Sequence, residues 1–239
     1  MFEPCQRLQD DLDLLEPTPQ LPFAIASVLP VMVTLPATDI TLRILKESLG
    51  LQLAPTPEFF PEWMEEPTPL STMEVSYLDR VEANFLSLVE EPPLLENSVK
   101  LVILAPLLDL AGFYRSPFRI KTETSVDIEM EDEDITIRGQ IDILVVKERL
   151  WLVVIESQRS DFAVTRALPQ TLAYMLSNPE LKQPTFGLIT NGNEFLFLKA
   201  TRRPRVQYAT SRLFSLINPQ NDLHEVLTIL KHLGQLSMT

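Results

Sequence analysis

Two acidic residues interrupt otherwise apolar stretches in the second half of the chain. Asp142 lies within GQIDILVV, and Glu156 ends LVVIE. An ionised carboxylate among apolar residues is costly unless a cation or hydrogen bonds compensate its charge. Two such carboxylates lying close together repel each other, and a divalent cation relieves that repulsion by taking their oxygens as ligands. The pair is therefore a candidate metal site, and ion pairing with Arg138 or Arg159 is the structural alternative.

The surrounding pattern predicts strands that bring these carboxylates together. Alternating or continuous apolar stretches indicate three consecutive antiparallel strands, at 118–128, 135–146 and 150–155. Pairing across the second turn places Asp142 opposite residue 155 or 156. Gln158 faces the same side as Glu156 if the strand continues. We therefore expect Asp142, Glu156 and Gln158 to line one patch.

Helices are expected before and after these strands. Ser71 and Glu74 form a capping box that begins one helix, and a second helix over 95–111 contains Pro106, which should kink or divide it. A third helix runs from Ser160 to Ser177. Two strands (185–190 and 194–199) and a helix (221–233) complete the chain. The order of helix, three strands, helix and two strands indicates an α/β domain.

Composition separates an N-terminal extension from this domain. Eleven of the 20 prolines precede residue 70, and the net charge of −13 divides into −17 over 1–134 and +4 over 135–239. We expect an acidic, proline-rich, partly helical extension over 1–70 and one domain over 71–239. The basic half favours a nucleic-acid surface, although charge runs are also typical of solvated faces.

The same composition bears on compartment and membrane contact. A single cysteine, Cys5, excludes an internal disulfide, so we expect a cytoplasmic protein. The apolar segment 21–37 contains three prolines and follows an acidic stretch, which argues against a signal peptide or a membrane-spanning helix.

These motifs resemble the PD-(D/E)XK nuclease superfamily, which has the restriction-endonuclease-like fold. The similarity lies in Gly139-Gln-Ile-Asp142, in Ile155-Glu156-Ser157-Gln158 and in Gln170-Thr-Leu-Ala-Tyr174. More narrowly, the chain is similar over residues 94–200 to the nuclease domain of type I restriction enzyme motor subunits. That similarity adds a helix from Glu96 through Pro106-Leu-Leu to Gly112-Phe, and the segment Pro184-Thr-Phe-Gly-Leu-Ile-Thr-Asn-Gly192.

The resemblance implies a role for each matching residue. Asp142 and Glu156 would bind Mg²⁺ or Mn²⁺, and Glu96 would help to order the metal site, with a first-turn acid favoured by the helix dipole as its alternative. Arg166, Gln170 and Tyr174 would share one helical face beside the DNA backbone. The alternative for Tyr174 is packing against the sheet.

The implied activity is hydrolysis of DNA phosphodiester bonds by a metal-activated water. The implied partners are DNA and either a second copy of the chain or a larger restriction-type assembly. The chain departs from the family at Gln158, where a lysine is usual. Glutamine can form hydrogen bonds but carries no charge. The alternative is therefore a catalytically degenerate member that acts as a nucleic-acid-binding or assembly module. A purely structural interaction protein using its apolar N-terminal segment is a third possibility.

Overall fold

The computed structural model describes residues 33–65, 69–90, 96–130, 135–147, 150–156, 163–178 and 182–236. The chain divides into two compact units, Met1–Val31 and Met32–Thr239, and all the described residues belong to the second. The acidic run at 131–134, Gln158 and the expected helix cap at Ser160 lie outside the described residues.

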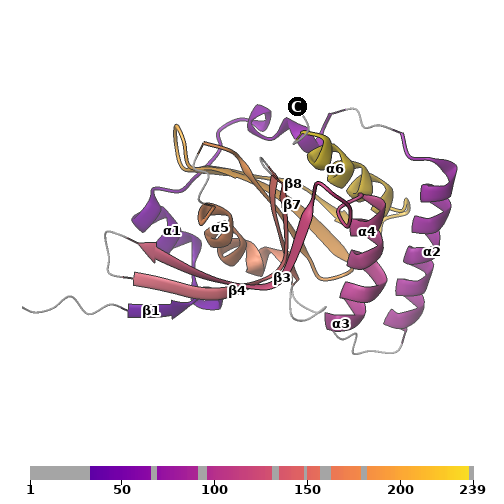
Figure 1. Cartoon of the computed structure of the whole chain (residues 1–239), viewed down its shortest axis with the longest axis horizontal. Coiled ribbons are helices and arrows are strands. Elements are labelled where there is room, and N and C mark those ends of the chain that lie inside the picture. Colours follow the sequence, from indigo (N-terminus) through magenta and orange to yellow (C-terminus); the bar gives the residue numbers. More distant parts are fainter. Residues whose placement is uncertain are drawn as a thin grey trace, which may run out of the picture. The chain divides into compact units, whose positions relative to one another are not determined.

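Eight strands form one mixed sheet, in the order β1-β4-β5-β6-β7-β8-β2, with β3 also paired to β4 (Figure 1). Their bounds are β1 Val33–Pro36, β2 Gln52–Leu53, β3 Arg119–Met130, β4 Ile135–Lys147, β5 Leu150–Glu156, β6 Thr185–Thr190, β7 Glu194–Thr201 and β8 Gln207–Ser215. Strands β3, β4 and β5 form the expected antiparallel meander. Strand β5 then pairs in parallel with β6. The architecture is the mixed α/β arrangement expected of a restriction-endonuclease-like core.

Helices cover both faces of this sheet and create two cores. The first core lies under α2 (Thr72–Val89), α4 (Ala105–Leu110) and α6 (Leu223–Leu236), and the second lies under α1 (Leu42–Leu49) and α5 (Leu168–Leu176). Figure 1 shows α2, α4 and α6 grouped on one side and α1 and α5 on the other. None of the described helices is long and apolar enough to cross a membrane.

The helix signals in the sequence explain most of the helix ends. The capping box at Ser71 and Glu74 is present at the start of α2. The helix expected over 95–111 is divided into α3 (Glu96–Val99), a π-helical turn η4 (Lys100–Leu104) and α4, and the division falls just before Pro106. A proline has no amide hydrogen and cannot donate the regular hydrogen bond of an α-helix. The π turn accommodates this irregularity directly before α4.

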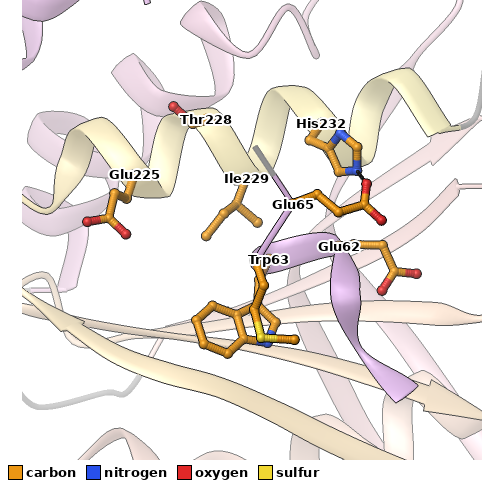
Figure 2. Close-up of a pocket in the computed structure, with 8 residues that line it drawn as sticks. Glu62, Trp63, Glu65, Glu225, Thr228, Ile229 and His232 are labelled. Atoms are coloured by element: carbon orange, nitrogen blue, oxygen red, sulfur yellow. Dashed lines mark ion pairs between the residues drawn. The ribbon is translucent and has the colours of Figure 1, made fainter. Parts of the chain in front are cut away.

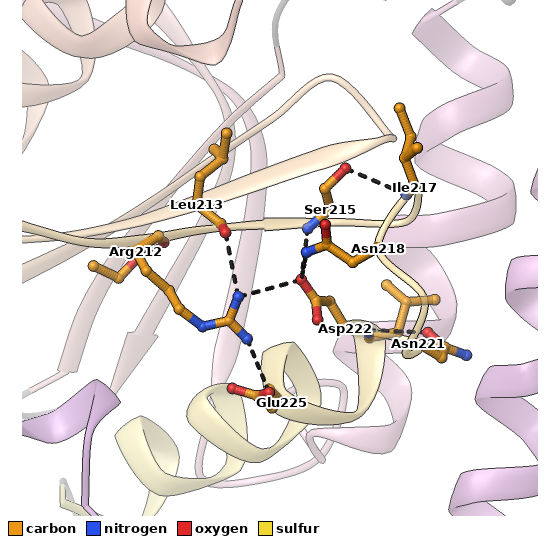
Figure 3. A network of polar contacts seen from close by, with 10 residues as sticks. Arg212, Leu213, Ser215, Ile217, Asn218, Asn221, Asp222 and Glu225 are labelled. Carbon is orange, nitrogen blue, oxygen red and sulfur yellow. Dashed lines mark hydrogen bonds and ion pairs between the residues drawn. The ribbon is translucent and has the colours of Figure 1, made fainter.

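Polar contacts fix α6 against the end of β8. The Asp222 carboxylate is 5% exposed and accepts hydrogen bonds from the Ser215 amide at 2.8 Å and the Asn218 side chain at 2.7 Å. The Arg212 guanidinium, which stacks on Phe214, lies 3.4 Å from Asp222 and 2.8 Å from Glu225 (Figure 3). Because three donors converge on Oδ2 of the buried Asp222 carboxylate, it holds the first turn of α6 in place.

The residues before the expected boundary at 70 pack into the sheet more closely than a separate extension would. Strand β1 pairs in parallel with β4, and β2 pairs in parallel with β8. Phe60 is 1% exposed and contacts Phe186, and Trp63 packs edge-on against Phe214. The compact unit therefore begins near residue 32, because residues 33–65 supply two strands of the sheet and several aromatic anchors.

Candidate active site

The sheet forks in the middle of β4. Strand β3 pairs with one edge of β4, from Ile135 to Val146. The other edge is shared, since β1 pairs with β4 at 135–138 and β5 pairs with it at 143–147. Residues 139–142 lie between these two partners, so Asp142 stands where β5 joins the fork.

Strand β4 also changes the direction of its side chains at this point. Ile141 belongs to the second core and Ile143 to the first, although residues two apart in a regular strand share a face. On β3, Glu123 lies between Thr122 and Thr124, which pair with Ile143 and Ile141, and its φ of 49° is uncommon for a residue other than glycine. The Gln140 side chain donates a hydrogen bond to the Glu123 carbonyl oxygen at 3.0 Å. This local distortion re-aims Asp142, and backbone strain of this kind is concentrated at functional sites.

Lys100 is the cation that the structure brings to Asp142. Its Nζ lies 3.4 Å from Asp142 Oδ1, and the two side chains are 26% and 24% exposed. Lys100 begins the π turn η4, which packs over the first core. Arg138, one of the partners considered from the sequence, lies 3.3 Å from Asp127. The pairing with Lys100 joins residues 42 positions apart on a helix and a strand, so spacing alone could not reveal it.

For the expected catalytic residues Glu156 and Glu96 the structure describes the backbone position only. Glu156 ends β5 and pairs with Thr190 of β6. Ile143 pairs with Val154, so the next position of this register sets Asp142 beside residue 155, one residue from Glu156. Glu96 begins α3 one helical turn before Lys100. The side chains of Glu156 and Glu96, and all of Gln158, lie outside the described part of the chain.

Gln170 and Tyr174 act together at the fork. Gln170 Nε2 donates a hydrogen bond to the Tyr174 hydroxyl at 3.2 Å, and that hydroxyl is also hydrogen-bonded to the backbone of Gln140. A Cβ added at Gly139 would collide with Tyr174 Oη and would lie 2.6 Å from Ala37 Cβ. The absence of a side chain at Gly139 therefore lets the tyrosine hydroxyl reach the backbone of β4 between β1 and β5.

Burial decides what Tyr174 can contact. The residue is 1% exposed. Burial, with a smaller contribution from the Asp142 carboxylate, raises the pKa of its hydroxyl, so the group stays protonated. Tyr174 consequently packs against the strand that carries Asp142, which is the alternative role expected for it from the sequence. Arg166, in the turn η5 (Val164–Ala167), is exposed and lies one turn before Gln170.

The donor chemistry of the fork fits a hard divalent cation. Asp142 offers carboxylate oxygens that already attract an ammonium group, and Glu156 ends the adjoining strand. Oxygen donors of this kind are those that Mg²⁺ prefers, usually from one or two carboxylates. Within the described residues there is no group of three or more His, Cys, Asp or Glu side chains that could hold a metal ion. The Glu156 side chain lies outside the described residues.

A separate pocket of about 430 Å³ lies between η3 (Pro61–Trp63) and α6 (Figure 2). Each carboxylate that lines it has a basic partner: Glu62 with Lys199 at 2.5 Å, Glu65 with His232 at 3.0 Å and Glu225 with Arg212 at 2.8 Å. The second histidine, His224, lies 2.9 Å from Asp79. These contacts tie the segment before α2 to the sheet and to α6, so this pocket is part of the scaffold.

Comparison with known proteins agrees with this geometry. A search of the curated proteins found no match. The family profile described as "Type I restriction enzyme R protein N terminus (HSDR_N)" matches residues 41–206. The matched region starts before α1, ends just before β8, and contains the fork, Lys100, Gln170 and Tyr174. The chain therefore belongs to the family of type I restriction enzyme R protein N-termini.

Proposed function

We propose that this chain is a Mg²⁺-dependent DNA endonuclease. Family membership supports a restriction-type nuclease role, and the observation that carries the finer assignment is the half-buried Asp142 carboxylate at the sheet fork, 3.4 Å from the Lys100 ammonium. A carboxylate, a cation and a second acid at the end of the next strand are groups that phosphodiester hydrolysis uses.

Asp142 and Glu156 would hold the metal ion through their carboxylate oxygens. When bound, the ion supplies an activated water nucleophile and neutralises negative charge on the reacting phosphate. The chain contributes the rigidity of the site, because the neighbours of Asp142 are paired, Ile141 and Ile143 with β3 and Ile143 also with β5, and Glu156 pairs with β6.

Lys100 would provide the positive charge that Gln158 lacks. Its ammonium already lies beside Asp142 and is partly exposed, so it can turn from the carboxylate to a phosphate oxygen by rotation of its side chain. Negative charge accumulates on the phosphate during hydrolysis, and a fixed cation beside it stabilises the transition state more than the ground state. Gln158 would retain a hydrogen-bonding role.

Tyr174 and Gln170 would act as positioning residues. Their hydrogen bonds hold the backbone at Gln140, two residues before Asp142. Arg166 is exposed one turn earlier and can contact the DNA backbone directly. The family also supports DNA as a partner and assembly with other subunits of a restriction complex.

A plasmid-nicking assay with Mg²⁺ or Mn²⁺ at low salt tests the proposal. Asp142→Asn and Glu156→Gln keep the shape of each side chain and remove its charge, so each should reduce cleavage by about 100-fold or more. Asp127→Asn is the matched control, because Asp127 also lies in the meander but is 63% exposed and pairs with Arg138. A well-folded native protein that neither binds Mg²⁺ or Mn²⁺ nor nicks DNA would contradict the proposal.

Gln158 favours one rival function, a degenerate member of the fold that binds nucleic acid without cutting it. In that case the native protein would bind DNA and remain silent in the nicking assay, and Gln158→Lys would introduce activity. Cleavage by the native protein that is lost in Asp142→Asn would exclude this rival.

A further inference from the structure

A cavity of about 560 Å³ lies at the far end of β4 from the fork. It is lined by Ser116, Pro117, Phe118, Arg119, Val146 and Lys147. Among these six described residues two are cationic, one carries a hydroxyl and none is a carboxylate, and the next two residues of the chain, 148 and 149, lie outside the described part. This composition is unusual in a chain with a net charge of −13.

Lys147 is the distinctive residue of this cavity. It is 8% exposed, and its ammonium lies 5.4 Å from the centre of the Phe118 ring. None of the described residues gives it a carboxylate partner. Lysine is almost never buried without one, because desolvation of the charge is costly and an aromatic face compensates only part of that cost.

Arg119 and Ser116 complete the polar lining. Arg119 begins β3 and pairs through its backbone with Val146, the residue before Lys147. Its side chain is exposed at the cavity, and the structure describes no ion pair for it. An arginine fork, a lysine point charge and a hydroxyl donor together match the oxygens of a phosphate group.

We infer that this cavity binds a phosphate group, and that the group is a backbone phosphate of the nucleic acid that enters the active site. The second part rests on the proposed function. Lys147 lies five residues after Asp142 on the same strand, which is about 16 Å along β4. Val145, two residues before Lys147, belongs to the same core as Ile143, so strand alternation sets Lys147 on the face that Lys100 covers, whereas the neighbouring lining residue Val146 packs against the second core. A DNA strand that is cut near Asp142 could thus be held in this cavity by a phosphate a few nucleotides away from the cut.

Lys147→Met in the full chain separates a binding role from a structural one. Methionine keeps the apolar stem and removes a buried charge that has no carboxylate partner within the described part of the chain, so we expect the Tm to rise. In EDTA, which prevents cleavage, a short DNA duplex should bind several-fold more weakly, and the slope of log affinity against log salt should fall by about one. Arg119→Gln should weaken binding in the same way, whereas Lys46→Met, which removes an exposed charge from α1, should not.

A second measurement distinguishes the source of the phosphate. Inorganic phosphate should raise the Tm of the native protein above that in chloride of equal ionic strength, and Lys147→Met should abolish the difference. One outcome is that phosphate raises the Tm of the native protein while the native protein and Lys147→Met bind the duplex with equal affinity. That result would support a phosphate site in the cavity and would show that its assignment to nucleic acid is wrong. A lower Tm for Lys147→Met with unchanged duplex and phosphate binding would overturn the inference. Asp142→Asn should keep full duplex binding, so failure of the nuclease proposal would be seen separately.

Discussion

The Tyr174 hydroxyl occupies the space that a side chain at Gly139 would need. This contact joins α5 to β4 where the sheet forks, three residues before Asp142. The same hydroxyl is hydrogen-bonded to Gln170 and to the backbone of Gln140. Gly139 leaves room for the Tyr174 hydroxyl, and together they fix the path of the strand that carries Asp142.

Gly139→Ala should destabilise the protein by about 3 kcal/mol, because its methyl group would overlap Tyr174 Oη and lie 2.6 Å from Ala37 Cβ. Urea unfolding measures the change. Adding Tyr174→Phe removes the first overlap, so the double variant should lose less than the sum of the two single variants. Strict additivity would show that the two residues do not meet at the fork.

Tyr174→Phe alone should cost about 1–2 kcal/mol, since the Gln140 backbone loses a buried partner. It should also reduce cleavage while leaving duplex affinity unchanged, because a residue that is 1% exposed does not touch DNA. Tyr208→Phe is the control: Tyr208 is also buried, and the structure describes no hydrogen bond from its hydroxyl. A loss of duplex affinity in Tyr174→Phe would argue against a positioning role.

Lys100→Met should have opposite effects on metal binding and cleavage. Under the proposed function the ammonium would compete with a divalent cation for Asp142, so its removal should tighten Ca²⁺ binding measured by calorimetry. Cleavage should fall about 100-fold, the scale observed when a fixed electrostatic donor is removed. Lys46→Met provides the charge control. If Lys100→Met weakened Ca²⁺ binding, or cut DNA at the native rate, Lys100 would have no part in the site.

Glu74 should make stability depend on acid pH. The Lys231 ammonium, 2.6 Å away, together with the capping interactions of Ser71, lowers the pKa of Glu74 from 4.5 to about 2. A depressed pKa means that the carboxylate stabilises the fold above pH 4.5, and that this contribution is lost as the pH falls toward 2. Glu74→Gln should therefore be less stable than the native protein at pH 6, with the difference shrinking between pH 4.5 and 2.

The sequence was sufficient for the elements whose signals are local. The meander β3 to β5, the capping box of α2 and the division of the helix at Pro106 all follow from periodicity, capping chemistry and the missing amide of proline. The start of α1 is also set locally, because the Thr41 side chain accepts a hydrogen bond from the Ile44 amide.

Elements and contacts defined by tertiary structure could not be predicted. Strand β2 is only two residues long and exists through its pairing with β8, which itself follows a loop rich in arginine. The distortion at Glu123 and Asp142 has no local sequence signal. Lys100 reads as an ordinary polar residue of a helix until the fold places that helix across β4. Only Gly139, as an isolated glycine within a strand pattern, hinted at a close approach of another group.

The two short strands before residue 54 have a consequence for how the domain forms. One closes an edge beside β4 and the other closes the opposite end of the sheet beside β8, although they are only 15 residues apart. Both pairings join segments distant in sequence, which slows folding because long loops must close first. A shortened chain that begins at Ser71 would expose both of these edges and should self-associate. The N-terminal strands thus cover the two edges of the sheet that carries Asp142.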